Sequence, residues 1–137
     1  MDMKTLEKDR ETSLNIVLYG KPESLFDTGG WIKYMDETII VSLFHSLPFA
    51  RRYIEQHEVD LILLDGDDDA VDWQYLVVCF RQIDPKIRIV LLSSSEEQSV
   101  RAYEAGLFDY LLKPVQRKQL ERIFAKCESA TARAKHE

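Results

Sequence analysis

The sequence has few of the features that mark secreted, membrane or nucleic-acid-binding proteins. Its only two cysteines, Cys79 and Cys127, match no metal or redox spacing, so we expect reduced thiols in a cytoplasmic protein. The longest apolar runs are only strand-sized and no secretory signal opens the chain, so we expect no membrane partner. The net charge of −6 argues against a broad basic face, so we expect this chain itself to bind no nucleic acid. The histidines form no ligand pair (His45, His57 and His136).

The length of the chain predicts one folded domain. Its 137 residues are enough to bury a core without disulfide staples. We expect a polar N-terminal tail over residues 1–13, the folded domain over residues 14–127, and a linker or helix extension over residues 128–137.

Five short apolar segments predict β-strands, at residues 14–19, 38–44, 59–65, 87–93 and 108–112. Helical patterns fill most of the gaps, at residues 47–57, 71–83, 97–105 and 115–127. Strands that alternate with helices predict an α/β fold with a parallel sheet. Right-handed crossovers favour the flavodoxin-like, doubly wound arrangement, a five-stranded sheet in the order 2-1-3-4-5 within three α/β/α layers.

The segment between the first two strands departs from this pattern. Gly29 and Gly30 stand in the middle of residues 22–37, where a helix should connect the strands. Each glycine costs a helix about 1 kcal/mol. We therefore expect this first helix to be short, broken or displaced. Trp31 and Trp73 are expected to be packing residues.

Polar residues end three of the predicted strands. Asp65 ends the third, Ser93 ends the fourth, and Lys113 follows the fifth. In open α/β sheets the chemistry lies beyond the carboxyl ends of the strands, where these side chains should meet. A carboxylate can attack a phosphoryl group, while a lysine and a hydroxyl hold its oxygens. The three residues therefore favour acyl-phosphate chemistry.

Three segments carry a resemblance to a known family. They are Glu-Ala-Gly-Leu-Phe-Asp-Tyr-Leu-Leu-Lys-Pro at 104–114, Val-Asp-Leu-Ile-Leu-Leu-Asp at 59–65 and Ile-Val-Leu-Leu-Ser-Ser at 89–94. Together they resemble the receiver domain of bacterial two-component response regulators, over about residues 14–124. The resemblance implies that Asp65 is the phosphoacceptor, Lys113 its ion partner and Ser93 a phosphoryl-binding residue. It also implies that Tyr110 is an aromatic switch and that the Lys113–Pro114 bond is cis.

The resemblance also implies partners. We expect a histidine kinase, or an output domain or protein, and a homodimer through the face made by the helix at 97–105, the strand at 108–112 and the helix at 115–127. The domain is expected to signal rather than to be an enzyme. Any DNA-binding output would lie outside this chain.

One part of the receiver pattern is missing. Receivers carry two acidic residues that hold Mg²⁺ after the first strand, whereas Tyr19 and Gly20 occupy those positions here. Without the metal, phosphorylation of Asp65 should be slow or absent. The acidic loop of Asp67, Asp68 and Asp69 could supply a weak Mg²⁺ site, or could be a solvated loop with no metal.

Two functions therefore compete. The leading one is an atypical receiver domain that acts as a weakly phosphorylated or phosphorylation-independent interaction module. The alternative is a phosphatase of haloacid-dehalogenase type, because Asp65 and Asp67 form an Asp-x-Asp motif after an apolar strand. Against that alternative, the motif lies on the third strand, and the threonine or valine expected after the second aspartate is absent.

Overall fold

The sheet has five parallel strands in the order β2-β1-β3-β4-β5, which confirms the predicted topology. The structure is a computed structural model that describes residues 14–136, so the tail predicted over residues 1–13 lies outside the described residues. The strands are β1 (Asn15–Tyr19), β2 (Ile40–Phe44), β3 (Leu61–Asp65), β4 (Ile89–Ser93) and β5 (Asp109–Leu112).

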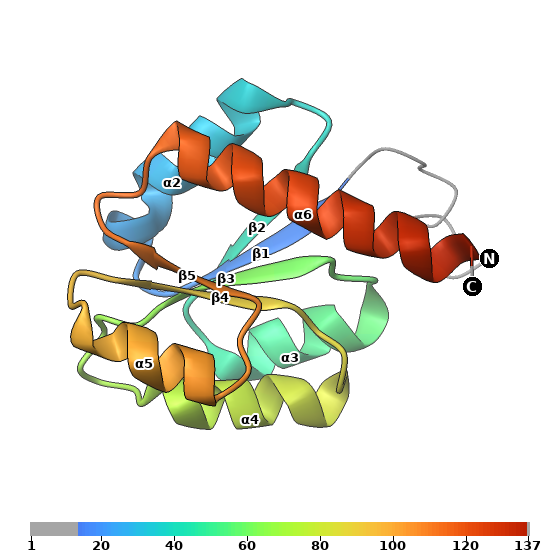
Figure 1. Ribbon diagram of the computed structural model, residues 1–137. Helices are drawn as coiled ribbons and strands as arrows, with labels where there is room; N and C mark the ends of the chain where they lie inside the picture. Colours follow the sequence, from blue (N-terminus) through green and yellow to red (C-terminus); the bar gives the residue numbers. More distant parts are fainter. Residues whose placement is uncertain (1–13, 137) are drawn as a thin grey trace.

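Helices cover both faces of the sheet (Figure 1). They are α2 (Pro22–Met35), α3 (Leu47–Gln56), α4 (Trp73–Ile83), α5 (Glu97–Glu104) and α6 (Arg117–His136). Buried residues of α2 and α6 pack on one face, and those of α3, α4 and α5 pack on the other. The result is the three-layer α/β/α arrangement that the alternating pattern predicts.

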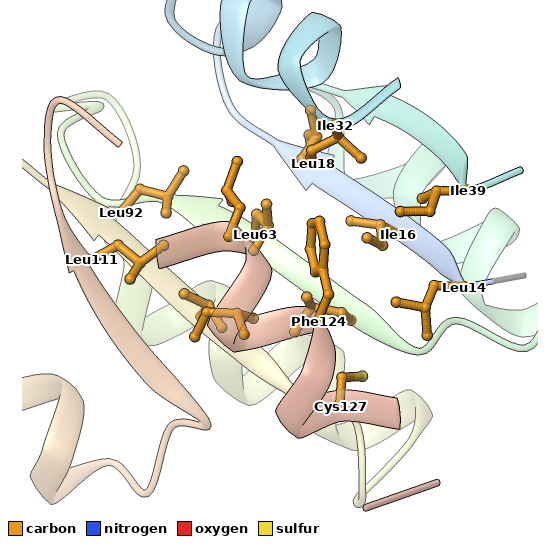
Figure 2. Packing of buried hydrophobic residues seen from close by; sticks show 14 of the residues in the cluster. Leu14, Ile16, Leu18, Ile32, Ile39, Leu63, Leu92, Leu111, Phe124 and Cys127 are labelled. Atoms are coloured by element: carbon orange, nitrogen blue, oxygen red, sulfur yellow. The ribbon is translucent and has the colours of Figure 1, made fainter. Parts of the chain in front are cut away.

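The core is divided between these two faces because successive strand residues point to opposite sides. In β1, Ile16 and Leu18 belong to the cluster under α2 and α6, whereas Val17 and Tyr19 belong to the other cluster. Figure 2 shows the Phe124 ring of α6 reaching from the helix toward the sheet in the first cluster. Strands β1, β3 and β4 are buried throughout, so their carboxyl ends are firmly positioned.

The expectation of a short, broken or displaced first helix is wrong. Helix α2 runs without interruption over 14 residues, with Pro22 at its start. Leu25 and Ile32 are fully buried against the sheet, and this burial outweighs the poor helix propensity of Gly29 and Gly30. A β-carbon on Gly29 would lie 3.3 Å from Leu18 Cδ1, so a glycine at this position lets the helix approach β1 closely.

The last helix runs into the segment that was predicted to be a linker or a helix extension. It begins at Arg117 rather than at 115, and its backbone continues through residues 128–136. Among the described residues, no helix is both long and apolar enough to cross a membrane.

Trp73 is buried as a packing residue should be, but Trp31 is 50% exposed, so the packing role expected for it is wrong.

Candidate functional site

Asp65 and Lys113 form an ion pair at the carboxyl edge of the sheet. Lys113 Nζ lies 2.9 Å from Asp65 Oδ1, which also accepts the Asp67 backbone N–H at 2.9 Å. The Asp65 side chain is only 2% exposed. Lys113 follows β5 directly, its backbone N–H donates to the Ser93 carbonyl at 2.8 Å, and its peptide bond to Pro114 is cis. The strand ends therefore bring the predicted carboxylate and ammonium into contact.

The carboxylate of Asp67 lies in a nest of donors on the same edge. It accepts the Ser93 hydroxyl at 3.0 Å and the Ser94 backbone N–H at 3.1 Å. Lys113 Nζ lies 3.1 Å from Asp67 Oδ2, so one ammonium bridges Asp65 and Asp67. A hydroxyl, a backbone amide and an ammonium that converge on one anion form an oxyanion-binding arrangement.

These contacts keep the Asp67 carboxylate and the Lys113 ammonium charged. Burial raises the pKa of Asp67, but the Ser94 N–H, Lys113 and the Ser93 hydroxyl outweigh it, so the pKa lies below the ordinary 3.8. Burial lowers the pKa of Lys113, yet its hydrogen bonds to Asp65 and Asp67 prevail and raise that pKa above 10.5. The nest is therefore complete at neutral pH.

A chain of hydrogen bonds leads from this nest to Tyr110. Ser93 is fully buried, and its hydroxyl oxygen accepts the Ser95 backbone N–H at 3.1 Å while its proton is donated to Asp67. The Tyr110 hydroxyl donates to the Ser95 carbonyl, and the ring packs against the core cluster of α3, α4 and α5. Tyr110, the residue predicted to switch, is thus half-buried and is linked to Asp67 through Ser95 and Ser93.

Tyr19 and Gly20, at the positions where the receiver pattern predicts an acidic pair, carry no carboxylate. Tyr19 is 4% exposed and packs edge-to-face on Phe80, and burial raises its pKa. Gly20 has a φ of +155°, and a β-carbon there would lie 2.7 Å from Asp65 Cβ. The space that an acidic side chain would need at this position is taken by Asp65 itself.

The other two acids of the loop point elsewhere. Asp68 Oδ2 lies 3.0 Å from His45 Nε2, and Asp68 Oδ1 lies 3.9 Å from Lys21 Nζ. The hydrogen bond to His45 is the main reason that the pKa of Asp68 is lowered. Asp69 is exposed and has no ion pair or hydrogen bond with any described residue. The three neighbouring aspartates therefore have three different environments.

The arrangement does not suit Mg²⁺, which prefers several free carboxylate oxygens. Lys113 bridges Asp65 and Asp67, and the carboxylate of Asp67, whose side chain is 30% exposed, also accepts hydrogen bonds from Ser93 and Ser94. Over residues 14–129, no group of three or more His, Cys, Asp or Glu side chains could hold a metal ion. The donor set present does not fit the receiver metal.

Two contributors to the site were missed by the sequence reasoning. The Ser94 backbone N–H gives no sequence signal, because any residue carries it. His45, which was expected to lie outside any cluster, follows β2 directly and lies beside Asp68. The rule that polar residues at strand ends converge could have found His45, since β2 is the neighbour of β1.

Comparison with known proteins identifies the family of the chain. The family described as the response regulator receiver domain matches residues 24–125. The transcriptional regulatory protein YpdB of Escherichia coli (strain K12) is 30% identical over 99 residues, 72% of this chain and 41% of YpdB. Protein MrkE of Klebsiella pneumoniae is 30% identical over 79 residues, 58% of this chain and 29% of MrkE. The chain thus spans less than half the length of these curated relatives.

Solved structures share the fold. A receiver domain from Methanospirillum hungatei JF-1 superposes with a TM-score of 0.72 at 22% identity, covering 89% of this chain and 99% of that one. The response regulatory domain of MrkE from Klebsiella pneumoniae gives a TM-score of 0.69 at 24% identity, covering 85% and 97%. These comparisons give no support to the phosphatase alternative. The chain belongs to the response regulator receiver domain family of two-component systems.

Proposed function

We propose that this receiver domain is an interaction module that holds its signalling conformation without phosphorylation. Receiver domains of response regulators act with kinases and output domains, and they are in general signalling domains rather than enzymes. The proposal concerns how this one works. In this proposal, the Asp67 carboxylate binds the residues that would otherwise bind the phosphoryl group. The conformation that other receivers reach by phosphorylation is then present without it.

The observation that carries the proposal is the set of donors around Asp67. Ser93 and Lys113 are the residues expected to hold phosphoryl oxygens, and both already bind the Asp67 carboxylate at 3.0 and 3.1 Å. Ser94 adds its backbone N–H at 3.1 Å. A phosphoryl group on Asp65 would have to compete with this internal anion for the same donors.

The state of Tyr110 supports the same proposal. In the proposed switch, a Ser93 hydroxyl drawn toward an anion leaves room for Tyr110 to turn inward, and the hydrogen bonds of Ser93 to Asp67 and of Tyr110 to Ser95 support this. The Tyr110 hydroxyl is held by the Ser95 carbonyl, and the Ser95 N–H is held by Ser93. Asp67 therefore has a physical route by which to bias the inward position of Tyr110.

Phosphoryl transfer to Asp65 would be poorly assisted. Such transfer depends on neutralising the charge that develops on the phosphoryl oxygens. Here Lys113 is shared with Asp67, and Gly20 offers no ligand for a metal. We propose that acetyl phosphate labels this domain far more slowly than a receiver with its acidic pair.

The surface that would transmit this state is the face of α5, β5 and α6. Tyr110 lies on β5 in this face, and α5 exposes Val100 and Tyr103, the latter by 88%. We propose this face for the output partner or for a second copy of the chain. Sedimentation velocity over a range of protein concentrations tests the homodimer, which Tyr103→Glu should weaken.

The first experiment is the intact mass after incubation with acetyl phosphate and Mg²⁺. We expect no added phosphoryl group on the wild type, while a receiver with its acidic pair is labelled in parallel. A rapid gain that Asp65→Ala abolishes would overturn the proposal.

A second experiment addresses Asp67 directly. Fluorotyrosine incorporated into the protein reports the position of Tyr110 by ¹⁹F NMR, with Tyr110→Phe used for assignment. Asp67→Ala should shift the Tyr110 signal toward a solvent-exposed environment, because Ser93 loses its acceptor. Asp69→Ala removes the same charge from the same loop and should leave the signal unchanged. Identical signals for wild type and Asp67→Ala would refute the proposed role.

A further inference from the structure

Helix α2 presents an aromatic surface that takes no part in the Asp65 site. Phe26 and Tyr34 are each 76% exposed and Trp31 is 50% exposed, all on this one helix. Single exposed aromatics are normal on a protein surface, but a group of them around a depression marks a contact site. We call this depression the α2 hollow; it has a volume of about 240 Å³ and is lined by Phe26, Asp27, Gly30, Trp31 and Tyr34.

Gly30 is the one residue of the α2 hollow without a side chain. A β-carbon on Gly30 would meet no atom within 4 Å, so packing does not require a glycine here, in contrast to Gly29 beside Leu18. Alanine would be the better helix former at such a position. What the glycine does provide is open space between the rings one turn before it and one turn after it, at Phe26 and Tyr34.

The walls suit a cation. The Trp31 and Tyr34 rings meet edge-to-face at 90°, with centroids 6.2 Å apart, and so form a corner. Aromatic faces attract guanidinium and ammonium groups, and tryptophan does so most strongly. The Asp27 carboxylate lines the same hollow and has no hydrogen bond or ion pair with any described residue.

The helix does not fill the hollow with a cation of its own. Lys33 Nζ donates to the Glu37 and Ile39 carbonyls at 2.8 and 2.7 Å. Lys21 Nζ lies 3.9 Å from Asp68, at the carboxyl edge of the sheet. Both basic residues of the α2 segment are thus turned away, and the hollow combines negative charge with exposed π surface.

We propose that the α2 hollow receives an arginine side chain from a protein partner. A guanidinium is planar, stacks on aromatic rings and pairs with a carboxylate through two hydrogen bonds, so it can use Trp31 and Asp27 together. Each ring is at least half exposed, so a free small molecule would stay largely in water. When a protein partner supplies the side chain, the partner surface around it also covers the exposed rings. Trp, Tyr and Arg are the residues that dominate such contacts.

The test is an NMR titration of the full chain with the peptide acetyl-Ala-Ala-Arg-Ala-Ala-amide. The matched probe carries citrulline, which keeps the shape of arginine and lacks its charge. We expect saturable shifts of the Trp31 indole N–H and of the α2 amides with the arginine peptide. The citrulline peptide should bind about tenfold more weakly, since it loses the charge on both the ring face and Asp27.

Variants distinguish binding in the hollow from non-specific binding to exposed aromatic residues. Trp31→Ala, Asp27→Asn and Gly30→Ala should each weaken arginine-peptide binding, the last because a methyl group takes up space in the hollow while the helix remains intact. Phe49→Ala removes a 65% exposed aromatic from α3 and should leave binding unchanged. Circular dichroism melts identify any variant that has lost its fold. If Trp31→Ala or Asp27→Asn is unfolded, the test rests on peptide binding by Gly30→Ala compared with Phe49→Ala.

Three results would overturn the proposal: equal binding of the arginine and citrulline peptides, unchanged binding by Gly30→Ala, or no shift at α2. A fourth would be α2 shifts that depend on protein concentration without peptide, because a second copy of the chain would then be the occupant. The proposal does not depend on the state of Asp65 or Asp67.

Discussion

Gly20 lies so close to Asp65 that a β-carbon on Gly20 would stand 2.7 Å from the Asp65 β-carbon. The same β-carbon would stand 2.9 Å from Leu25 Cδ1, and the backbone φ of +155° is one that other residues rarely adopt. The packing around Asp65 therefore leaves no room for a side chain at position 20.

A side chain at position 20 should accordingly destabilise the fold. Gly20→Asp combines backbone strain with overpacking, and we expect a loss of about 2–4 kcal/mol in the free energy of unfolding. Urea unfolding followed by circular dichroism measures it. A variant as stable as the wild type would show that the end of β1 relaxes easily and that the contact with Asp65 does not exclude a side chain.

The two glycines of α2 should respond differently to alanine. Gly30→Ala should stabilise the domain by roughly 0.5–1 kcal/mol, because the helix gains propensity and the added methyl group meets no atom within 4 Å. Gly29→Ala should gain less or lose stability, because its methyl group would lie 3.3 Å from Leu18 Cδ1. Thermal melts of the two variants provide the comparison, and equal gains would contradict the close packing of α2 on β1.

The Asp65–Lys113 pair should be strongly coupled. Lys113→Ala leaves the buried Asp65 carboxylate without its cation and should cost about 3 kcal/mol. Asp65→Asn combined with Lys113→Ala should cost less than the sum of the single changes, by about 1–3 kcal/mol. Chemical unfolding of the four proteins of the cycle measures this coupling.

The exposed pair Arg117–Glu121, with side chains 52% and 51% exposed, is the control for that cycle. Its coupling should be no more than about 0.5 kcal/mol, because water screens both groups. Similar couplings for the two pairs would mean that Asp65 is less enclosed than its 2% exposure indicates.

The Asp67 nest should make stability depend on pH at the acid end. The folded-state pKa of Asp67 lies below 3.8, so its contribution is fully present above 3.8 and is lost as the pH falls through the folded-state value. The stability difference between wild type and Asp67→Asn should therefore be constant near neutral pH and shrink below about pH 4.

Lys113 gives the opposite sign at the alkaline end. Its folded-state pKa lies above 10.5, so its contribution is present below 10.5 and is lost as the pH rises through the folded-state value. Urea unfolding across the pH range checks both ends, with Asp69→Asn as the control for the acid limb. A wild-type and Asp67→Asn difference that does not change with pH would contradict the charged nest.

Much of the fold could be predicted because its signals are local. Each inner strand is a short apolar run, and alternation with helical patterns leaves few sheet orders. The α2 prediction failed because glycine propensity is local while the burial of Leu25 and Ile32 is tertiary. Nothing in residues 22–37 alone states how closely that helix approaches Leu18.

The site could be predicted only in part, for a similar reason. That Asp65 and Lys113 meet, with Ser93 at the end of the neighbouring strand β4, follows from the ends of parallel strands. The direction of Asp67 depends on loop backbone beyond β3, where three neighbouring aspartates look alike in the sequence. Only the structure distinguishes the bound Asp67 from Asp69, which has no partner among the described residues.

The anion that Ser93, Ser94 and Lys113 hold is a side chain of the chain itself. An aspartyl phosphate is a mixed anhydride and decays by hydrolysis. The rate of this hydrolysis sets the lifetime of the phosphorylated state in an ordinary receiver. A carboxylate bonded to its own backbone has no such lifetime. In a domain governed by this anion, no hydrolysis rate would limit the lifetime of the signalling state. The strength of its output would depend on how much of the protein the cell makes and degrades.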